Sequence, residues 1–110
     1  MVIVPLLNAK GQVEIKPNGI AIQIKDNREV FCVLDLVAFR NAIWYEWGFS
    51  NRKFWLNYSE PGKVRLYLRR SFGGDDLVVV DRDELLSALQ EFVGEIQTMD
   101  DLLADVAINI

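Results

Sequence analysis

The residues with the clearest chemical character lie in two short runs on either side of Ser59–Gly62. Because Pro61 and Gly62 favour a turn, the two runs predict a β-hairpin whose alternate side chains point to opposite faces. One face collects the polar and aromatic side chains Lys53, Trp55, Asn57, Lys63, Arg65, Tyr67 and Arg69. Cations neutralise phosphates and aromatic rings stack on unpaired bases, so this face predicts binding of single-stranded DNA or RNA.

Charge is separated by sign along the chain. The 110 residues carry 12 basic and 16 acidic side chains, a net charge of −4. Residues 1–51 are neutral overall, and residues 52–70 carry six basic side chains against Glu60 alone. Residues 71–110 carry ten acidic side chains against Arg82 alone. The predicted binding face therefore coincides with the one basic segment of an acidic chain.

The hairpin has two other interpretations. An antiparallel sheet commonly leaves one face to solvent, where Lys and Arg stay hydrated and an aromatic ring costs little. Alternatively, Trp55 and Tyr67 are covered by the other half of the chain or by a second subunit, as aromatic residues often are at interfaces. A duplex ligand is disfavoured, because duplex readers usually insert a helix and both predicted helices carry acids on their polar faces.

The elements that precede the hairpin follow from the spacing of apolar residues. Alternation through Val13–Ile15 and Ile20–Ile24 around a turn predicts a first hairpin. A strand from Val2 to Leu7 is expected before it and another from Glu29 to Leu34 after it. Four strands therefore precede the first helix.

The first helix has clear start and stop signals. Asp35 is the expected N-cap and Gly48 the expected end. Helical spacing puts Trp47 on the apolar face and Arg40 on the polar face, and the remaining apolar positions are Leu36, Phe39 and Ile43. The second half repeats this order, with the hairpin, a strand from Leu77 to Val80 and a helix that Asp81 caps.

The predicted class is α+β, with antiparallel sheets and helices on one face. We expect one domain, with possible half-repeats at 1–50 and 51–97 and a short C-terminal helix at 98–107. In outline the order is four strands and a helix, then three strands and a helix. Each half thus consists of strands followed by a capped helix.

This order and patterning resembles the PUR repeat. Residues 53–58, 63–70 and 77–80 with the helix from Arg82 resemble one copy, and residues 19–25, 29–34 and 36–47 resemble a second; the Whirly and positive-cofactor-four coactivator families are similar. The resemblance implies an intracellular protein, a homodimer, and binding of single-stranded nucleic acid on sheets with helices behind them. The matching face of the first half has no aromatic ring and little net charge: Gln12, Glu14, Lys16, Ala21, Gln23 and Lys25. Only the second copy carries the binding chemistry.

The acidic C-terminal half supports an alternative function. It could make the chain a protein-interaction or inhibitor module that binds a basic protein partner or imitates phosphate charge. Acidic runs are also typical of solvated helix faces and favour helix N-termini. An apolar stripe at helical spacing either closes the core or forms a dimer or partner contact: Met99, Leu102, Leu103 and Val106.

Catalytic and cofactor motifs are missing. The chain has no histidine, and Gly73–Gly74 lacks the spacing and the lysine of a phosphate-binding loop. The single cysteine, Cys32, lies in an apolar run and is expected to be an inert core thiol. Asp75 and Asp76 are too few ligands to predict a divalent cation. We expect no enzyme activity, no cofactor, no metal and no membrane segment, and an intracellular setting without disulfides.

Overall fold

The computed structural model describes residues 2–25, 28–70 and 74–94. In chain order the elements are β1 (Val2–Pro5), β2 (Gly11–Lys16), β3 (Gly19–Ile24), β4 (Arg28–Val33), α1 (Leu36–Tyr45), β5 (Phe54–Asn57), β6 (Lys63–Leu68), β7 (Asp76–Asp81) and α2 (Arg82–Val93). The α+β class and the order of strands and helices are confirmed. The predicted helix at 98–107 lies outside the described residues.

The strands form two antiparallel sheets. Sheet A has the order β1-β2-β3-β4 and sheet B the order β5-β6-β7. In sheet A, the β2–β3 hairpin turns at Pro17–Asn18, and Ile15 lies opposite Ile20. In sheet B, Leu56 lies opposite Leu66 on β6. Both registers place apolar residues of neighbouring strands on the same face, as the alternation predicts.

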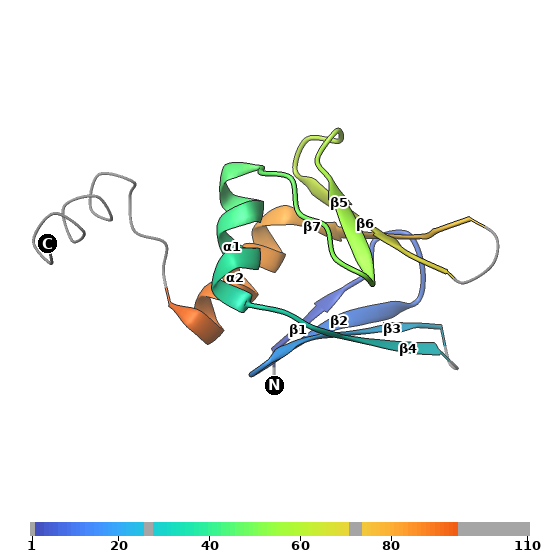
Figure 1. Ribbon diagram of the computed structural model, residues 1–110, viewed down its shortest axis with the longest axis horizontal. Coiled ribbons are helices and arrows are strands. Elements are labelled where there is room, and N and C mark those ends of the chain that lie inside the picture. Colours follow the sequence, from blue (N-terminus) through green and yellow to red (C-terminus); the bar gives the residue numbers. More distant parts are fainter. Residues whose placement is uncertain (1, 26–27, 71–73, 95–110) are drawn as a thin grey trace, which may run out of the picture.

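One core joins both sheets to both helices. The two helices lie side by side at one end of the molecule, and the strands run from them toward the opposite end (Figure 1). Phe39 of α1, Phe54 of β5 and Leu85 of α2 are each 0% exposed. Their cluster also includes Ile20 and Ile22 of sheet A. This cluster covers the middle of the inner face of each sheet, and the outer faces remain available to a large ligand.

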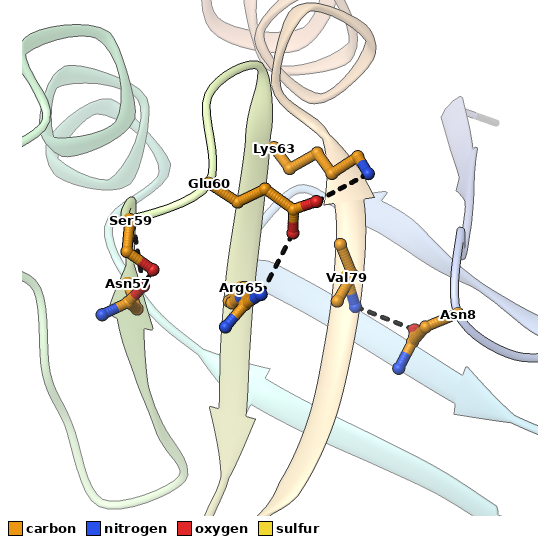
Figure 2. Close-up of polar contacts among 7 residues, drawn as sticks. All are labelled: Asn8, Asn57, Ser59, Glu60, Lys63, Arg65 and Val79. Atoms are coloured by element: carbon orange, nitrogen blue, oxygen red, sulfur yellow. Dashed lines mark hydrogen bonds and ion pairs between the residues drawn. The ribbon is translucent and has the colours of Figure 1, made fainter.

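Asn8 joins the two sheets. After β1, the Leu7 amide donates to the Val79 carbonyl at 2.8 Å, so the chain continues along the edge of β7. The Asn8 side chain then acts like a piece of backbone. Its Oδ1 accepts from the Val79 amide at 3.0 Å (Figure 2). Its Nδ2 donates to the Leu77 carbonyl at 2.8 Å. These bonds fix sheet B against sheet A and satisfy the β7 edge.

Both predicted helix caps are present. Asp35 Oδ1 accepts from the Val37 amide at 2.9 Å, and Asp81 Oδ2 accepts from the Glu84 amide at 3.0 Å. Each bond satisfies an amide that has no partner within its helix. The caps explain why each set of strands passes directly into a helix.

Three expectations for the first helix were wrong. Arg40 was expected on the polar side but is only 8% exposed, because its Nη1 donates to the carbonyls of Val93 and Gly94 at 3.3 and 2.9 Å. There it satisfies the last carbonyls of α2 and complements the negative end of that helix. The helix also ends before Gly48, since Glu46 adopts the left-handed conformation at φ 56°. Trp47 consequently lies beyond the helix and is 48% exposed.

Candidate nucleic-acid interface

Local hydrogen bonds build the hairpin that carries the predicted site. Asn51 Oδ1 accepts from the amides of Lys53 and Phe54 at 2.8 and 3.0 Å, which turns the chain into β5. At the other end, Asn57 Oδ1 accepts from the Ser59 amide at 2.9 Å, and Gly62 has φ 75°. These are the side-chain and glycine devices that tight turns require.

The inner face of the hairpin is closed. Its apolar side chains are at most 7% exposed: Phe54, Leu56, Val64, Leu66 and Leu68. Tyr58 continues this face, and its hydroxyl donates to the Ala42 carbonyl of α1 at 3.1 Å. Burial raises the pKa of Tyr58 to about 12, so the hydroxyl keeps its proton and remains a donor. The hairpin is thus anchored to α1 from behind.

All of the predicted residues on the hairpin lie on its outer face. Lys53 and Arg69 are exposed, and five side chains are partly exposed: Trp55, Asn57, Lys63, Arg65 and Tyr67. The register places Trp55 opposite Tyr67 and Asn57 opposite Arg65. The Arg69 amide donates to the Lys53 carbonyl at 2.8 Å, which brings these two cations to the same end of the hairpin. We call this set of seven residues the basic face.

A pair of stacked rings occupies the centre of the basic face. The ring centroids of Trp55 and Tyr67 are 4.0 Å apart and their planes differ by 7°. The indole Nε1 of Trp55 donates to Asp75 Oδ2 at 2.9 Å, which fixes the orientation of the stack. Each ring covers one face of the other, and both remain partly exposed. A planar ligand can therefore extend this stack only at a ring face that is turned away from the partner ring.

Glu60 pairs with two of the cations. Its Oε1 lies 2.8 Å from Lys63 Nζ and its Oε2 lies 3.1 Å from Arg65 Nη2 (Figure 2). The hydrogen bond from Lys63, followed by that from Arg65, holds the pKa of Glu60 below its ordinary value. An anion that binds Lys63 and Arg65 must compete with this carboxylate.

The other two cations of the basic face differ in their contacts. Arg69 Nε donates to the Asn51 carbonyl and its Nη2 donates to Ser50 Oγ, both at 3.1 Å. Lys53 forms no ion pair with any residue that the structure describes. The four cations of the basic face lie beside Glu60 and Asp75, so the net charge of this surface is +2.

The structure adds cations that sequence reasoning did not assign to the site. Lys25, Arg28 and Arg70 line a cleft. Lys25 follows β3 and Arg28 begins β4, at the end of sheet A that lies away from the helices (Figure 1). Arg28 belongs to sheet A and Arg70 follows sheet B, and both pair with Asp76. A run of basic residues signalled Arg70, but nothing in the local pattern signals the approach of Arg28.

The remaining sequence predictions concern Cys32, metal binding, membrane spans and the C-terminal apolar stripe. Cys32 is 1% exposed, and burial raises the pKa of its thiol, which keeps it in the unreactive neutral form. In the part of the chain that the structure describes, no three His, Cys, Asp or Glu side chains are grouped to hold a metal ion. Neither helix within 2–25, 28–70 and 74–94 has the length and apolar character needed to cross a bilayer. The predicted contact residues lie outside the described residues: Met99, Leu102, Leu103 and Val106.

Comparison of the chain with protein-family models, curated proteins and solved structures finds no match.

Proposed function

We propose that the chain binds single-stranded DNA or RNA on the basic face of sheet B. The Trp55–Tyr67 stack carries this proposal, since it is a partly exposed aromatic surface surrounded by cations. Base stacking on an aromatic side chain contributes about 1–3 kcal/mol per base. The four cations of the basic face supply charges for the phosphates on either side of such a base: Lys53, Lys63, Arg65 and Arg69.

The shape and charge of the molecule favour a single strand over a duplex. The basic face is a sheet surface, on which separated bases can stack, whereas a duplex hides the faces of its bases. Helix α2 would be the natural element to enter a groove, but its exposed side includes Asp83, Glu84 and Glu91. These carboxylates would repel the phosphates on both sides of the groove.

The resemblance to PUR-type repeats agrees with this proposal. It implies strand binding on the sheets, an intracellular setting and a homodimer, and we adopt all three as part of the proposed function. The outer face of sheet A was expected to have no aromatic ring. That expectation was wrong because the comparison of the two halves left out β4, whose Phe31 lies opposite Ala21 and is 38% exposed. This single ring is no counterpart to the stacked pair, since Gln12 and Gln23 occupy a corresponding cross-strand pair. We therefore assign strand binding to sheet B alone.

Fluorescence anisotropy with a labelled single strand of mixed sequence tests the proposal. We expect affinity to weaken with salt at a log–log slope of about −3 if about four phosphates are neutralised. Replacing Arg65 by Gln together with Tyr67→Ala should abolish binding while the circular dichroism spectrum stays that of the wild type. An unlabelled duplex that competes as well as an unlabelled single strand would contradict a role for base stacking.

An acidic groove along α2 favours a second candidate, binding of a basic protein segment. The groove has a volume of about 420 Å³ and is lined by Val2, Ile3, Asp83, Glu84, Ser87, Ala88 and Glu91. Ile3 is 42% exposed in this groove. A partner segment with an apolar residue flanked by Lys or Arg would therefore match both the exposed Ile3 side chain and the carboxylates of the groove. Glu84→Gln with Glu91→Gln should weaken capture of a polylysine probe and leave single-strand binding intact. If only the polylysine probe binds, the second candidate replaces the first.

A further inference from the structure

A cleft opens where the two sheets end, on the side away from the helices. Its volume is about 520 Å³, and its lining comes from both sheets and from the loop that follows β1: Ala9, Ile24, Lys25, Arg28, Arg70, Asp76 and Leu77. Arg28 and Asp76 continue the inward-facing positions of β4 and β7. The cleft is therefore the open end of the space that the core fills.

One carboxylate holds two guanidinium groups together in this cleft. Asp76 accepts from Arg70 Nε at 2.9 Å and lies 2.7 Å from Arg70 Nη2, and it also pairs with Nη1 of Arg28. A guanidinium has five N–H donors. Among the described residues, Arg70 Nη1 and the Nε and Nη2 of Arg28 have no hydrogen-bond partner. These donors remain for an anion.

Lys25 adds a third cation in an uncommon backbone conformation. Its φ is 55°, in the left-handed region that side chains other than Gly, Asn and Asp rarely adopt. Its amide donates to the Lys10 carbonyl at 2.8 Å, which holds the turn in place. A lysine at this position supplies charge to the cleft where glycine would be the easier residue.

The balance of charge indicates the class of anion. Three cations and one carboxylate give the described lining a net charge of +2. A phosphomonoester carries about −1.5 to −2 at pH 7, whereas a phosphodiester within a strand carries about −1. Ile24 and Leu77 add apolar surface beside the cations, which suits the sugar or base attached to the phosphate.

The cleft borders the basic face, because Leu77 lines the cleft and lies opposite Tyr67 in the register of β6 and β7. The chain also passes between the two surfaces twice. Arg69 belongs to the basic face and Arg70 lines the cleft. Asp75 accepts a hydrogen bond from the Trp55 indole, and the next residue, Asp76, pairs with both arginines of the cleft. From these observations we propose that the cleft binds the terminal phosphate of a single strand whose bases stack on Trp55 and Tyr67. This inference rests on the proposed function and adds a preference for strand ends that carry a phosphate.

Anisotropy with oligothymidylates tests the inference, using strands with a 5′-phosphate, a 3′-phosphate or hydroxyls at both ends. We expect one phosphorylated strand to bind about tenfold more tightly than the hydroxyl strand, the size of one good hydrogen bond between charged groups. The triple variant Arg28→Gln, Arg70→Gln, Asp76→Asn removes the charged cluster without leaving an unpaired carboxylate. This variant should abolish the preference for the phosphorylated strand. Its affinity for the strand with hydroxyls at both ends should change by less than about twofold.

Two single variants distinguish the effect of losing a charge in the cleft from the effect of disturbing the fold. Lys25→Gly removes a cation and relieves the backbone, so it should reduce the preference without lowering the melting temperature. Lys16→Gln removes a cation at the opposite end of sheet A, beside Glu14, and should leave the preference unchanged. Equal reductions in both variants would contradict a local phosphate site.

The outcomes distinguish this inference from the proposed function. If hydroxyl and phosphorylated strands bind equally, the phosphate site is wrong and strand binding stands. If no strand binds, strand binding is wrong, and thymidine 5′-monophosphate then tests the cleft alone. Shifts of the Lys25 and Arg28 amide resonances with that probe would support a phosphate site, and unchanged resonances would overturn it.

Discussion

The outer faces of the two sheets contrast sharply although both sheets are antiparallel and close the same core. On sheet A, Gln12 lies opposite Gln23, Lys16 pairs with Glu14, and Ala21 is 3% exposed. On sheet B, Trp55 stacks on Tyr67 and cations surround the stack. Inward-facing residues build the fold in both cases, so the outward-facing residues are where the two sheets can differ in function.

The two faces also differ in how their charges are balanced. Lys16 on sheet A has one carboxylate within 3.5 Å, so the pair is neutral. On sheet B, Glu60 divides its two oxygens between Lys63 and Arg65, which leaves an excess of positive charge. A shared carboxylate orders two cations without neutralising both. Asp76 does the same for Arg28 and Arg70 in the cleft.

Of all the changes considered, removing the stacked rings should most reduce the difference in strand binding between the two sheets. Trp55→Ala with Tyr67→Ala should weaken single-strand binding about 10- to 100-fold, since each stacked base contributes about 1–3 kcal/mol. Anisotropy at fixed low salt measures the loss. Phe31→Ala, which removes a 38% exposed ring from the outer face of sheet A, is the matched control and should bind as the wild type does. Comparable losses in both variants would mean that exposed rings act nonspecifically.

The Asn8 side-chain hydrogen bonds, which connect the two sheets, should contribute more to the stability of the fold than an exposed side chain of sheet A does. Asn8→Ala deletes both side-chain bonds to β7 and leaves the Val79 amide without its acceptor, in a residue that is 7% exposed. We expect a loss of about 1–3 kcal/mol in the free energy of unfolding, measured by urea denaturation. Gln23→Ala truncates an exposed amide of sheet A and should change stability by less than about 0.5 kcal/mol. An unaltered urea midpoint for Asn8→Ala would show that these two hydrogen bonds are not needed for stability.

Tyr58 should make the attachment of sheet B sensitive to alkaline pH. Its pKa is raised to about 12 in the folded chain and is near 10 when unfolded, so the unfolded state loses its proton first. The stabilisation is complete below pH 10 and is lost as pH rises toward 12. Melting temperature should therefore fall more steeply above pH 10 for the wild type than for Tyr58→Phe. Parallel curves for the two proteins would argue against this anchor.

Glu60 should act as a mild internal competitor of the strand. Glu60→Gln releases Lys63 and Arg65, so affinity for a single strand should rise about threefold and its salt dependence should steepen. Glu14→Gln on sheet A makes the same change in net charge beside Lys16 and should have no effect. Reduced affinity in Glu60→Gln would show that Glu60 instead orders the cations for binding.

Much of the fold follows from local sequence. Alternation correctly assigned Phe54 and Leu56 to the inside and Trp55 to the outside, because successive side chains of a strand point to opposite faces. Asp35 and Asp81 marked both helix starts, because a cap needs only residues that are adjacent in the chain. Such features depend on a few neighbouring residues and are therefore visible in the sequence.

Contacts between distant residues could not be predicted in this way. Arg40 has the polar character of a surface residue, yet its partners are carbonyls 53 and 54 residues later. The pairing of Arg28 with Asp76 depends on the approach of two sheets that share no local pattern. Alternation also places Trp55 and Tyr67 on one face without showing that their rings stack. The face was predictable, but its internal contacts and the cleft were not.

The most direct test of strand binding uses Trp55 as its own reporter. The chain has three tryptophans, and Trp44 and Trp47 are 45% and 48% exposed, so Phe replaces both at little cost and leaves Trp55 alone. Titration of this variant with a single strand should quench Trp55 emission, saturating at the same concentration as the anisotropy change. Strand binding that leaves Trp55 emission unchanged, or no binding at low salt, would contradict base stacking on sheet B.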